Sequence, residues 1–556
     1  MPFSLDRSSQ VRARFLLTRA RMAAASRILL AIGLTALAPV ASAQTAPEPL
    51  VDPPTTYPAP PPATAPAVDP EALSALEAKL AAMAARVDQL EAAAAAAASP
   101  EPEAATDPSS PPRVPVAPSD PDGFRFGSYG RVIAGTDLDG GKPEPIHVVA
   151  HGPRIVEATY LELDFAYRYR FAEHGTIRTV TTLAFGDDLF HDTGDFGAAP
   201  AIRNLYAETT VGTLSAWVGS RMYRGDDLYL FDFWPLDDLN TVGGGLAKTI
   251  SLDDVHAQTV TVAVHAGVNR LLVPFQYQER TVAQPELGTT TVVQLNRQRM
   301  ITSLRADYAR IPIDGSMGYR ARLYGELHAL PSGNRQRGDA TLEYLPDDWG
   351  TTIGAEVSVW QQPGTTGRSR HANLFARWSK GLAAFDELAA PTSFDAELKT
   401  FSAASELVFG LGSNWDAAWG HVTSAAYARR FVDADRNLQD RDDGWEYALD
   451  VRPAAKLRGG LHAALDLAYE ARFPRGLQPT TQLAADPAIV SIAPMLTYAP
   501  TGPSAFDRPE LRLVYRAAHQ NPGALALYPS TDPRAVAWTH FLGVEAEWWF
   551  NSNSYR

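Results

Sequence analysis

The sequence predicts an all-β body, a transmembrane antiparallel β-barrel, preceded by a short α-helical coiled coil. Three observations support this prediction. From Phe124 to Phe550, apolar and charged side chains alternate with a period of two, as in strands with one lipid-facing and one water-facing side. The body ends on an aromatic strand. The residues before Phe124 show Pro-rich stretches and a helical repeat instead.

Composition excludes several classes of protein. The chain has 556 residues, a formal charge of -14 and no cysteine. Without cysteine there are no disulfides, zinc–thiolate sites, iron–sulfur clusters or thiol nucleophiles. The acidic balance argues against nucleic acid as a partner, because such proteins carry a basic footprint. No cofactor follows from the sequence.

Residues 1–43 have the pattern of a secretory signal peptide. Six arginines, the last at position 27, precede an apolar run from Ile28 to Ala41, and Ala41-Ser42-Ala43 is a small-residue cleavage site. Translation could also begin at Met22. A membrane anchor is the alternative, but the run is too short to span a bilayer and contains Pro39.

Residues 44–70 and 100–123 are Pro-rich and predict extended linkers. Between them, residues 71–99 predict a coiled-coil helix, because apolar residues recur at alternating spacings of three and four. A lone amphipathic helix, the alternative, would show a wider apolar stripe. The seam consists of Leu73, Leu76, Leu80, Met83, Val87 and Leu90.

The segment from Tyr160 to Phe171 shows the alternation most clearly. Leu163, Phe165 and Tyr167 fall on one face, and Glu162 and Arg168 on the other. A soluble sandwich also alternates, but it seldom sets a long aromatic row against so many charges. The pattern therefore predicts a membrane strand beside a wet lumen.

The terminal strand follows the same rule. If Phe550 faces lipid, so do Val544 and Leu542, whereas Trp549 and the two glutamates before it face the lumen. Beyond the leader no apolar run reaches the length of a transmembrane helix, so a closed barrel is the spanning structure left. Roughly 430 residues suit 16 to 18 strands. Residues 551–556 are a C-terminal extension.

The stretch from Trp217 to Gly245 mixes aromatic rings with carboxylates and ends in three glycines. A soluble core would bury the rings and exclude the acids. A sugar site uses both, since pyranose faces are apolar and hydroxyl edges need charged hydrogen-bond partners. The stretch therefore favours sugar binding.

These residues also resemble a known family. The W-x-G-x-R-x-Y start at Trp217, the Gly-rich exit, Phe126-Gly-Ser-Tyr129-Gly-Arg131 and Thr159-Tyr160-Leu-Glu162-Leu are similar to the maltoporin family of sugar-specific outer-membrane porins. The resemblance implies about 18 strands, a homotrimer and facilitated diffusion of maltodextrins or other oligosaccharides across the outer membrane of a Gram-negative bacterium. Related sucrose porins are similar in carrying a periplasmic coiled coil.

The resemblance further implies a line of lumen aromatics along which sugars stack, flanked by polar tracks. The stacking positions it implies are Tyr129, Tyr160, Phe190 (lent to a neighbouring subunit), Trp234, Phe385 and Trp549. The hydrogen-bonding positions it implies are Arg131, Arg154, Glu162, Arg203, Asp227, Asp232 and Asp237. Gly225 stands at the family's constriction arginine, beside Arg224, and Leu457 stands at a later slide tryptophan.

Other functions remain open on sequence grounds. The first alternative is a general or anion-selective porin without sugar specificity, although lysine is scarce and aspartates crowd the constriction stretch. The others are an outer-membrane enzyme, for which no catalytic motif is present, and a structural tether to the cell wall. Calcium could bind acidic loops, one near Asp187 and one near Asp433.

Overall fold

The computed structural model describes residues 122–551, apart from short gaps. The gaps fall at 173–174, 187–188, 191–199, 224, 238, 254–256, 285, 287, 312–316, 338–340, 362–368, 386–398, 435–442, 477–484 and 502–503. The predicted signal peptide, both linkers up to residue 121 and the coiled coil lie outside the described residues, as does Arg224.

Eighteen strands form one closed antiparallel sheet, which confirms the predicted barrel. Each strand pairs with the next barrel strand in chain order, and the last pairs back to the first. The first nine are β1 (Gly123–Thr136), β2 (Tyr160–Ala172), β3 (Gly175–Gly186), β4 (Ala201–Val211), β5 (Leu214–Tyr223), β6 (Leu239–Asp253), β7 (Gln258–Asn269), β10 (Arg299–Arg310) and β11 (Met317–Leu330). The others are β14 (Asp348–Gln361), β15 (Arg370–Gly381), β16 (Ser405–Ala417), β17 (Gly420–Val432), β18 (Gly444–Arg458), β19 (Leu461–Pro474), β20 (Ala488–Tyr498), β21 (Glu510–Gln520) and β22 (Trp538–Phe550).

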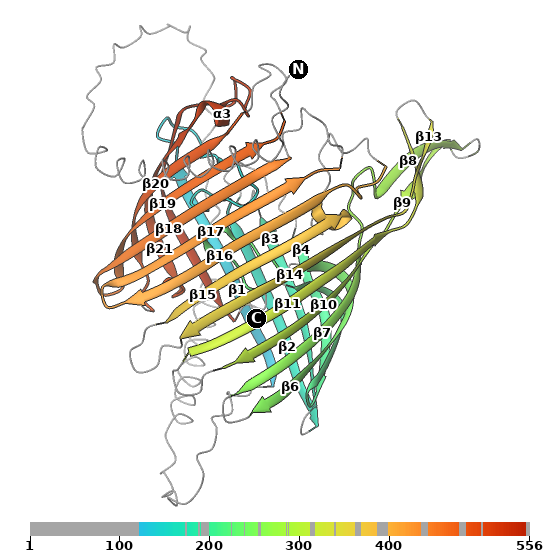
Figure 1. Ribbon diagram of the computed structural model, residues 1–556, viewed down its shortest axis with the longest axis horizontal. Coiled ribbons are helices and arrows are strands. Elements are labelled where there is room, and N and C mark those ends of the chain that lie inside the picture. Colours follow the sequence, from blue (N-terminus) through green and yellow to red (C-terminus); the bar gives the residue numbers. More distant parts are fainter. Residues whose placement is uncertain are drawn as a thin grey trace, which may run out of the picture. The chain divides into compact units, whose positions relative to one another are not determined.

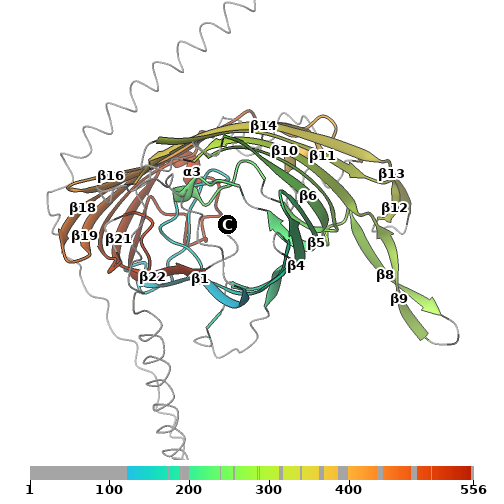
Figure 2. The ribbon, with the colours of Figure 1, turned by 90° about the horizontal axis from the view of Figure 1, so that it is seen from below.

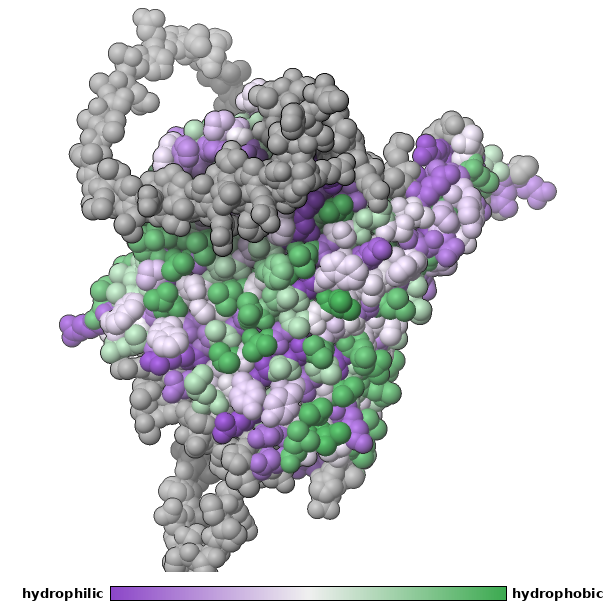
Figure 3. All heavy atoms as spheres, in the orientation of Figure 1, coloured by the Kyte–Doolittle hydropathy of each residue, from purple (hydrophilic) through white to green (hydrophobic). Residues whose placement is uncertain are grey.

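Alternation along the strands separates two surfaces. On β22, Leu542, Val544 and Phe550 are exposed on the outside, whereas Glu545 and Glu547 are buried inside, as the terminal pattern predicted. Figure 3 shows apolar side chains spread over the barrel wall. The closed ring leaves no unpaired edge in lipid, which is the condition for a sheet to span a membrane. No helix of the described part is long and apolar enough to cross a membrane.

Connections at the two ends of the barrel differ in length. At one end β2–β3, β4–β5, β16–β17 and β18–β19 are joined by links of only two residues. At the other end the links are longer, including 137–159, 187–200 and 224–238. Short links are periplasmic and long ones extracellular in barrels of this type. The longest link at the short end is residues 499–509, between β20 and β21.

Two extra hairpins project from the long-link end. The first pairs β8 (Tyr277–Gln284) with β9 (Gly288–Asn296), and the second pairs β12 (Gly333–Gln336) with β13 (Leu342–Leu345). Figures 1 and 2 show β8 and β9 pointing away from the ring of strands. The buried guanidinium of Arg297 donates to the carbonyls of Phe275, Pro331 and Pro346, and so ties the roots of both hairpins together.

Two long links fold back into the barrel instead (Figure 2). Residues 224–238, which we call the inner loop, and residues 137–159, the first loop, meet the inner wall in one apolar cluster. The cluster joins Ile146, Val148 and Val149 of the first loop, Leu228, Leu230, Phe231, Phe233 and Leu236 of the inner loop, and wall residues including Tyr324, Phe375, Val408 and Tyr427. A buried apolar core therefore fills part of the lumen.

Candidate functional site

The inner loop is shaped by a tight local turn. Leu228 and Phe233 form an isolated β-bridge, in which the Leu228 amide donates to the Phe233 carbonyl at 2.7 Å. Tyr229–Phe231 form a short 3-10 turn, and Asp232 closes it in the left-handed region at φ 48°. Asp enters that region more readily than bulky residues do. The turn exposes the Asp232 carboxylate at its tip.

Two leucine side chains of the inner loop pack against glycines of the barrel wall. A Cβ at Gly410 would lie 2.7 Å from Leu228 Cδ1, and one at Gly354 would overlap Leu236 Cδ2. A larger residue at either place would push the loop off the wall. The absence of side chains there thus fixes how closely the inner loop approaches β14 and β16.

Charged anchors hold the same loop from the wall. Arg377 donates to the Pro235 carbonyl at 3.1 Å and to Glu406 at 2.5 Å, and Arg429 donates to Glu406 at 2.5 Å. At the ends of the loop, Asp226 pairs with Arg320 and Asp237 with Arg305. The contacts to Pro235, Asp226 and Asp237 join the loop to the wall, and removing one partner of a buried pair would leave an uncompensated charge.

The first loop is anchored on the opposite side. The amides of Val148 and Ala150 donate to Glu470 and Glu446, each at 3.1 Å. The His151 ring stacks on Phe233 with centroids 3.8 Å apart. Burial, with the charges of Arg429 and Arg377, lowers the pKa of His151 to about 3. His151 is therefore neutral at physiological pH and behaves as a packing ring.

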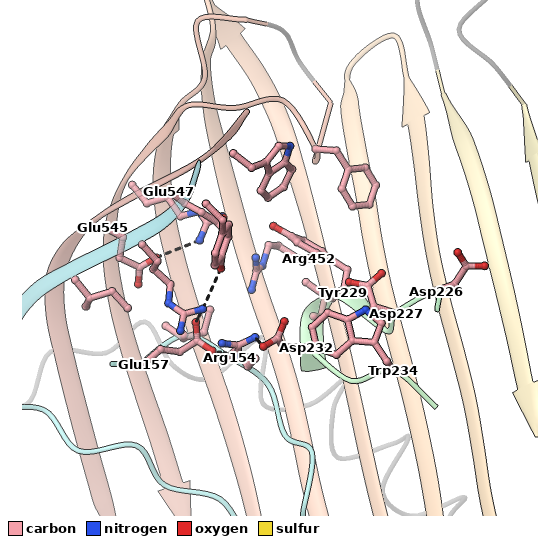
Figure 4. Close-up of a pocket in the computed structure, with 18 of the residues that line it drawn as sticks. Arg154, Glu157, Asp226, Asp227, Tyr229, Asp232, Trp234, Arg452, Glu545 and Glu547 are labelled. Carbon is pink, nitrogen blue, oxygen red and sulfur yellow. Dashed lines mark hydrogen bonds and ion pairs between the residues drawn. The ribbon is translucent and has the colours of Figure 1, made fainter. Parts of the chain in front are cut away.

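A cavity of about 480 Å³ remains between these loops and the wall formed by β1, β18, β21 and β22 (Figure 4). Its volume lies in the range of small-molecule sites. Five aromatic rings line it, those of Tyr129, Tyr229, Trp234, Phe506 and Trp549. Its charged lining consists of Arg131, Arg154, Glu157, Asp226, Asp227, Asp232, Arg452, Arg512, Glu545 and Glu547.

Most of these charges belong to chains of ion pairs. Arg131 contacts Glu157 at 2.6 Å, and Arg154 bridges Glu157 to Asp232, so that the first loop is linked to the inner loop. On the neighbouring strands β21 and β22, Arg512 contacts Glu547 at 2.9 Å and Glu545 at 3.3 Å. A wall of alternating donors and acceptors can exchange hydrogen bonds with a polyhydroxylated solute without a single strong charge.

The structure brings together seven of the residues singled out in the sequence. Tyr129, Arg131, Arg154, Asp227, Asp232, Trp234 and Trp549 all line the cavity. Tyr160, Glu162 and Arg203 stand beside it as a hydrogen-bonded triad, with Arg203 donating to Glu162 at 2.8 Å. The Tyr160 ring lies 5.9 Å from that of Tyr129. These three side chains therefore lie on β2 and β4, next to the cavity.

Three expected residues lie elsewhere. Asp237 anchors the inner loop to Arg305 rather than facing the cavity. Phe385 is buried against Phe401 and Phe431 beyond the end of β15. Phe190 is about half exposed, at 45%, in the link between β3 and β4.

Sequence reasoning did not select eight of the aromatic or charged lining residues, namely Glu157, Asp226, Tyr229, Arg452, Phe506, Arg512, Glu545 and Glu547. The alternation of β22 carried a signal for two of them, because Glu545 and Glu547 share a face with Trp549. Within the described residues, no group of three or more His, Asp or Glu side chains is arranged to hold a metal ion.

Three solved structures of similar fold are distant from this chain in sequence. OmpF of Salmonella typhi, in complex with daunomycin, is 11% identical, covers 77% of this chain and 97% of its own, and gives a TM-score of 0.34. OccD3 of Pseudomonas aeruginosa is 9% identical, with coverages of 77% and 91% and a TM-score of 0.37. OccAB1 of Acinetobacter baumannii is 10% identical, covers 77% of this chain and 95% of its own, and gives a TM-score of 0.40. These likenesses carry no functional argument.

Comparison with curated proteins finds no match. A family model does match, over the whole barrel. The model described as LamB porin aligns with residues 124–550, which run from β1 to the end of β22 and include every residue that lines the cavity except Asn551. This chain therefore belongs to the LamB porin family, as an 18-stranded barrel of the outer membrane.

Proposed function

We propose that the protein is a trimeric channel for facilitated diffusion of sugars, maltodextrins or other oligosaccharides, through an aromatic slide and polar tracks. The observation that carries the proposal is the composition of the cavity, in which five rings stand among ten charged side chains. Family membership supports a channel rather than an enzyme. The N-terminal coiled coil would then extend into the periplasm.

Ring faces and paired charges suit neutral sugars better than ions. Stacking on an aromatic face contributes about 0.5 to 1.5 kcal/mol per ring beyond the area buried, so each site is shallow. Six carboxylates and four arginines line the cavity. An anion-selective pore would place an excess of basic side chains at this point. The balance of charge thus favours the sugar channel over the anion channel.

The test is conductance of the purified, refolded protein in planar bilayers during titration with maltose, maltohexaose, sucrose and cellobiose. Saturable block by a sugar, weakened in Trp234→Ala, is expected, because Trp234 lines the cavity on the inner loop. A steady current that no sugar blocks would refute sugar specificity and leave a general porin. Chemical crosslinking of the native membrane protein tests the trimer.

A further inference from the structure

The link between β20 and β21, residues 499–509, is the longest at its end of the barrel, and its residues 502–503 lie outside the described part of the chain. The Phe506 ring lies 5.2 Å from the ring of His371, at the start of β15. At the same time, Arg508 donates to Glu547 of β22 at 3.0 Å through Nε. Four strands, β16 to β19, separate β15 from β20. The described residues 504–509, which we call the exit segment, therefore reach from the β20–β22 side of the barrel to β15.

The exit segment meets the tip of the inner loop. The rings of Tyr229 and Phe506 pack edge to face with centroids 5.1 Å apart. Arg508 donates to the Tyr229 hydroxyl and lies over the Trp549 ring, with its guanidinium carbon 4.0 Å from the centroid. The Arg508 side chain is 1% exposed. One buried cation therefore fixes the positions of Tyr229, Trp549 and Glu547 together.

Two stacking positions implied by the family resemblance have no counterpart at the cavity. Leu457 stands where a tryptophan was expected, and its side chain is 55% exposed. Phe385 is buried in a separate cluster. In contrast, Tyr229 and Phe506 both line the cavity, next to Trp549. The cavity thus takes Tyr229 from the inner loop and Phe506 from the exit segment, beside Tyr129 and Trp549 from strands.

We propose that Tyr229 and Phe506 form a stacking subsite for a pyranose ring at the exit end of the path, following Tyr129 and Trp549. The subsite rests on the proposed sugar channel and adds the exit segment to it. Its ligand is the apolar face of a neutral hexose unit. The edge-to-face pair presents two ring surfaces of different orientation, so a sugar leaving Trp549 would meet a shallow second site before the periplasm.

The competing explanation is that the pair only latches the inner loop to the exit segment. Three substitutions in the full-length protein separate the two. Phe506→Leu removes the ring but keeps an apolar side chain and the bond between Arg508 and Tyr229. Phe506→Tyr keeps a ring. Phe385→Leu is the matched control, since it removes a phenylalanine ring outside the cavity.

The measurement is the half-blocking concentration of the best-blocking sugar from the titration above, with sugar added on one side of the bilayer at a time. Phe506→Leu is expected to raise this half-blocking concentration on the order of 2- to 10-fold, because one stacking contact is lost. Phe506→Tyr should restore tight block, and Phe385→Leu should match the wild type.

Other outcomes overturn the subsite. Equal half-blocking concentrations in Phe506→Leu and wild type would show that the ring makes no contact with sugar. A rise in sugar-free conductance that Phe506→Tyr fails to reverse would show a latch alone. Equal weakening by Phe385→Leu would show a general packing effect. Absence of block in the wild type would refute the proposed function itself, and the subsite with it.

Discussion

The two faces of the inner loop differ as a protein core differs from a binding site. On one face Leu228 and Leu236 fit against glycines of the wall, in a cluster that excludes water. On the other face Asp227, Asp232 and Trp234 line an open cavity. Only 15 residues separate β5 from β6, yet they supply both surfaces. A porin of this kind narrows its lumen by packing, and the packing in turn sets where solute can touch the wall.

The largest expected effect comes from breaking the buried charges behind the packed face. Glu406→Leu leaves Arg377 and Arg429 without their shared carboxylate, which costs on the order of 3 to 5 kcal/mol. The loop should detach and single-channel conductance in salt should rise severalfold. Bilayer recordings check this. Unchanged conductance and unchanged sugar block would show that the network does not hold the loop.

Truncation within the packed face comes next. Leu228→Ala should weaken docking by about 3 kcal/mol, because a fully buried leucine leaves a cavity between loop and wall. Conductance should become noisy or increase, and sugar block should weaken. Leu304→Ala on the lipid-facing side of β10 is the control and should change neither property. If both variants behave alike, the apolar cluster is not what positions the loop.

Lowering the pH is expected to weaken the packed face of the inner loop, since His151 stacks on Phe233 there. Its pKa of about 3 in the docked state lies below the ordinary 6.5, so the undocked state binds the extra proton between these values. Docking is thus fully stable above pH 6.5 and is weakened as pH falls, by roughly 2 kcal/mol at pH 5. Conductance recorded from pH 8 to pH 5 should increase. His151→Phe keeps a stacking ring without a titratable group, so the pH dependence of conductance should be reduced in this variant. If the pH dependence is the same as in the wild type, other groups cause it.

The smallest effect is expected on the cavity face. Trp549→Leu removes one stacking surface and should weaken sugar binding by about 0.5 to 1.5 kcal/mol while the docked loop is retained. Sugar titration of conductance measures this. Loss of block by more than 100-fold would contradict the picture of many shallow contacts, and point to one dominant site.

Local sequence pattern was enough to predict the wall. The period of two placed Leu542 and Val544 outside and Glu545 inside, and it did so because strand side chains alternate whatever the partner strand is. The same parity correctly brought Tyr129 and Trp549 to one cavity. The barrel and its lumen-facing strands were thus predictable from short stretches of chain.

The interior could not be predicted in the same way. The contact between Phe506 and His371 joins positions 135 residues apart, and no local period encodes it. Phe385 lies in a short 3-10 turn, where the alternation that sorts strand residues does not apply. Tyr229 belongs to an irregular loop whose orientation depends on Arg508 and on wall glycines far away in sequence. Long-range packing decides each of these positions.

The seam between β1 and β22 has a consequence for biogenesis. Tyr129 and Arg131 come from the first strand, and Glu545, Glu547 and Trp549 come from the last. These side chains meet only when the ends of the barrel segment have paired, with Tyr129 opposite Trp549 and Arg131 opposite Glu547. A chain cut short during synthesis, or stalled before insertion is complete, would have most of its wall but not this side of the cavity. Closure of the ring and completion of the cavity are therefore a single event.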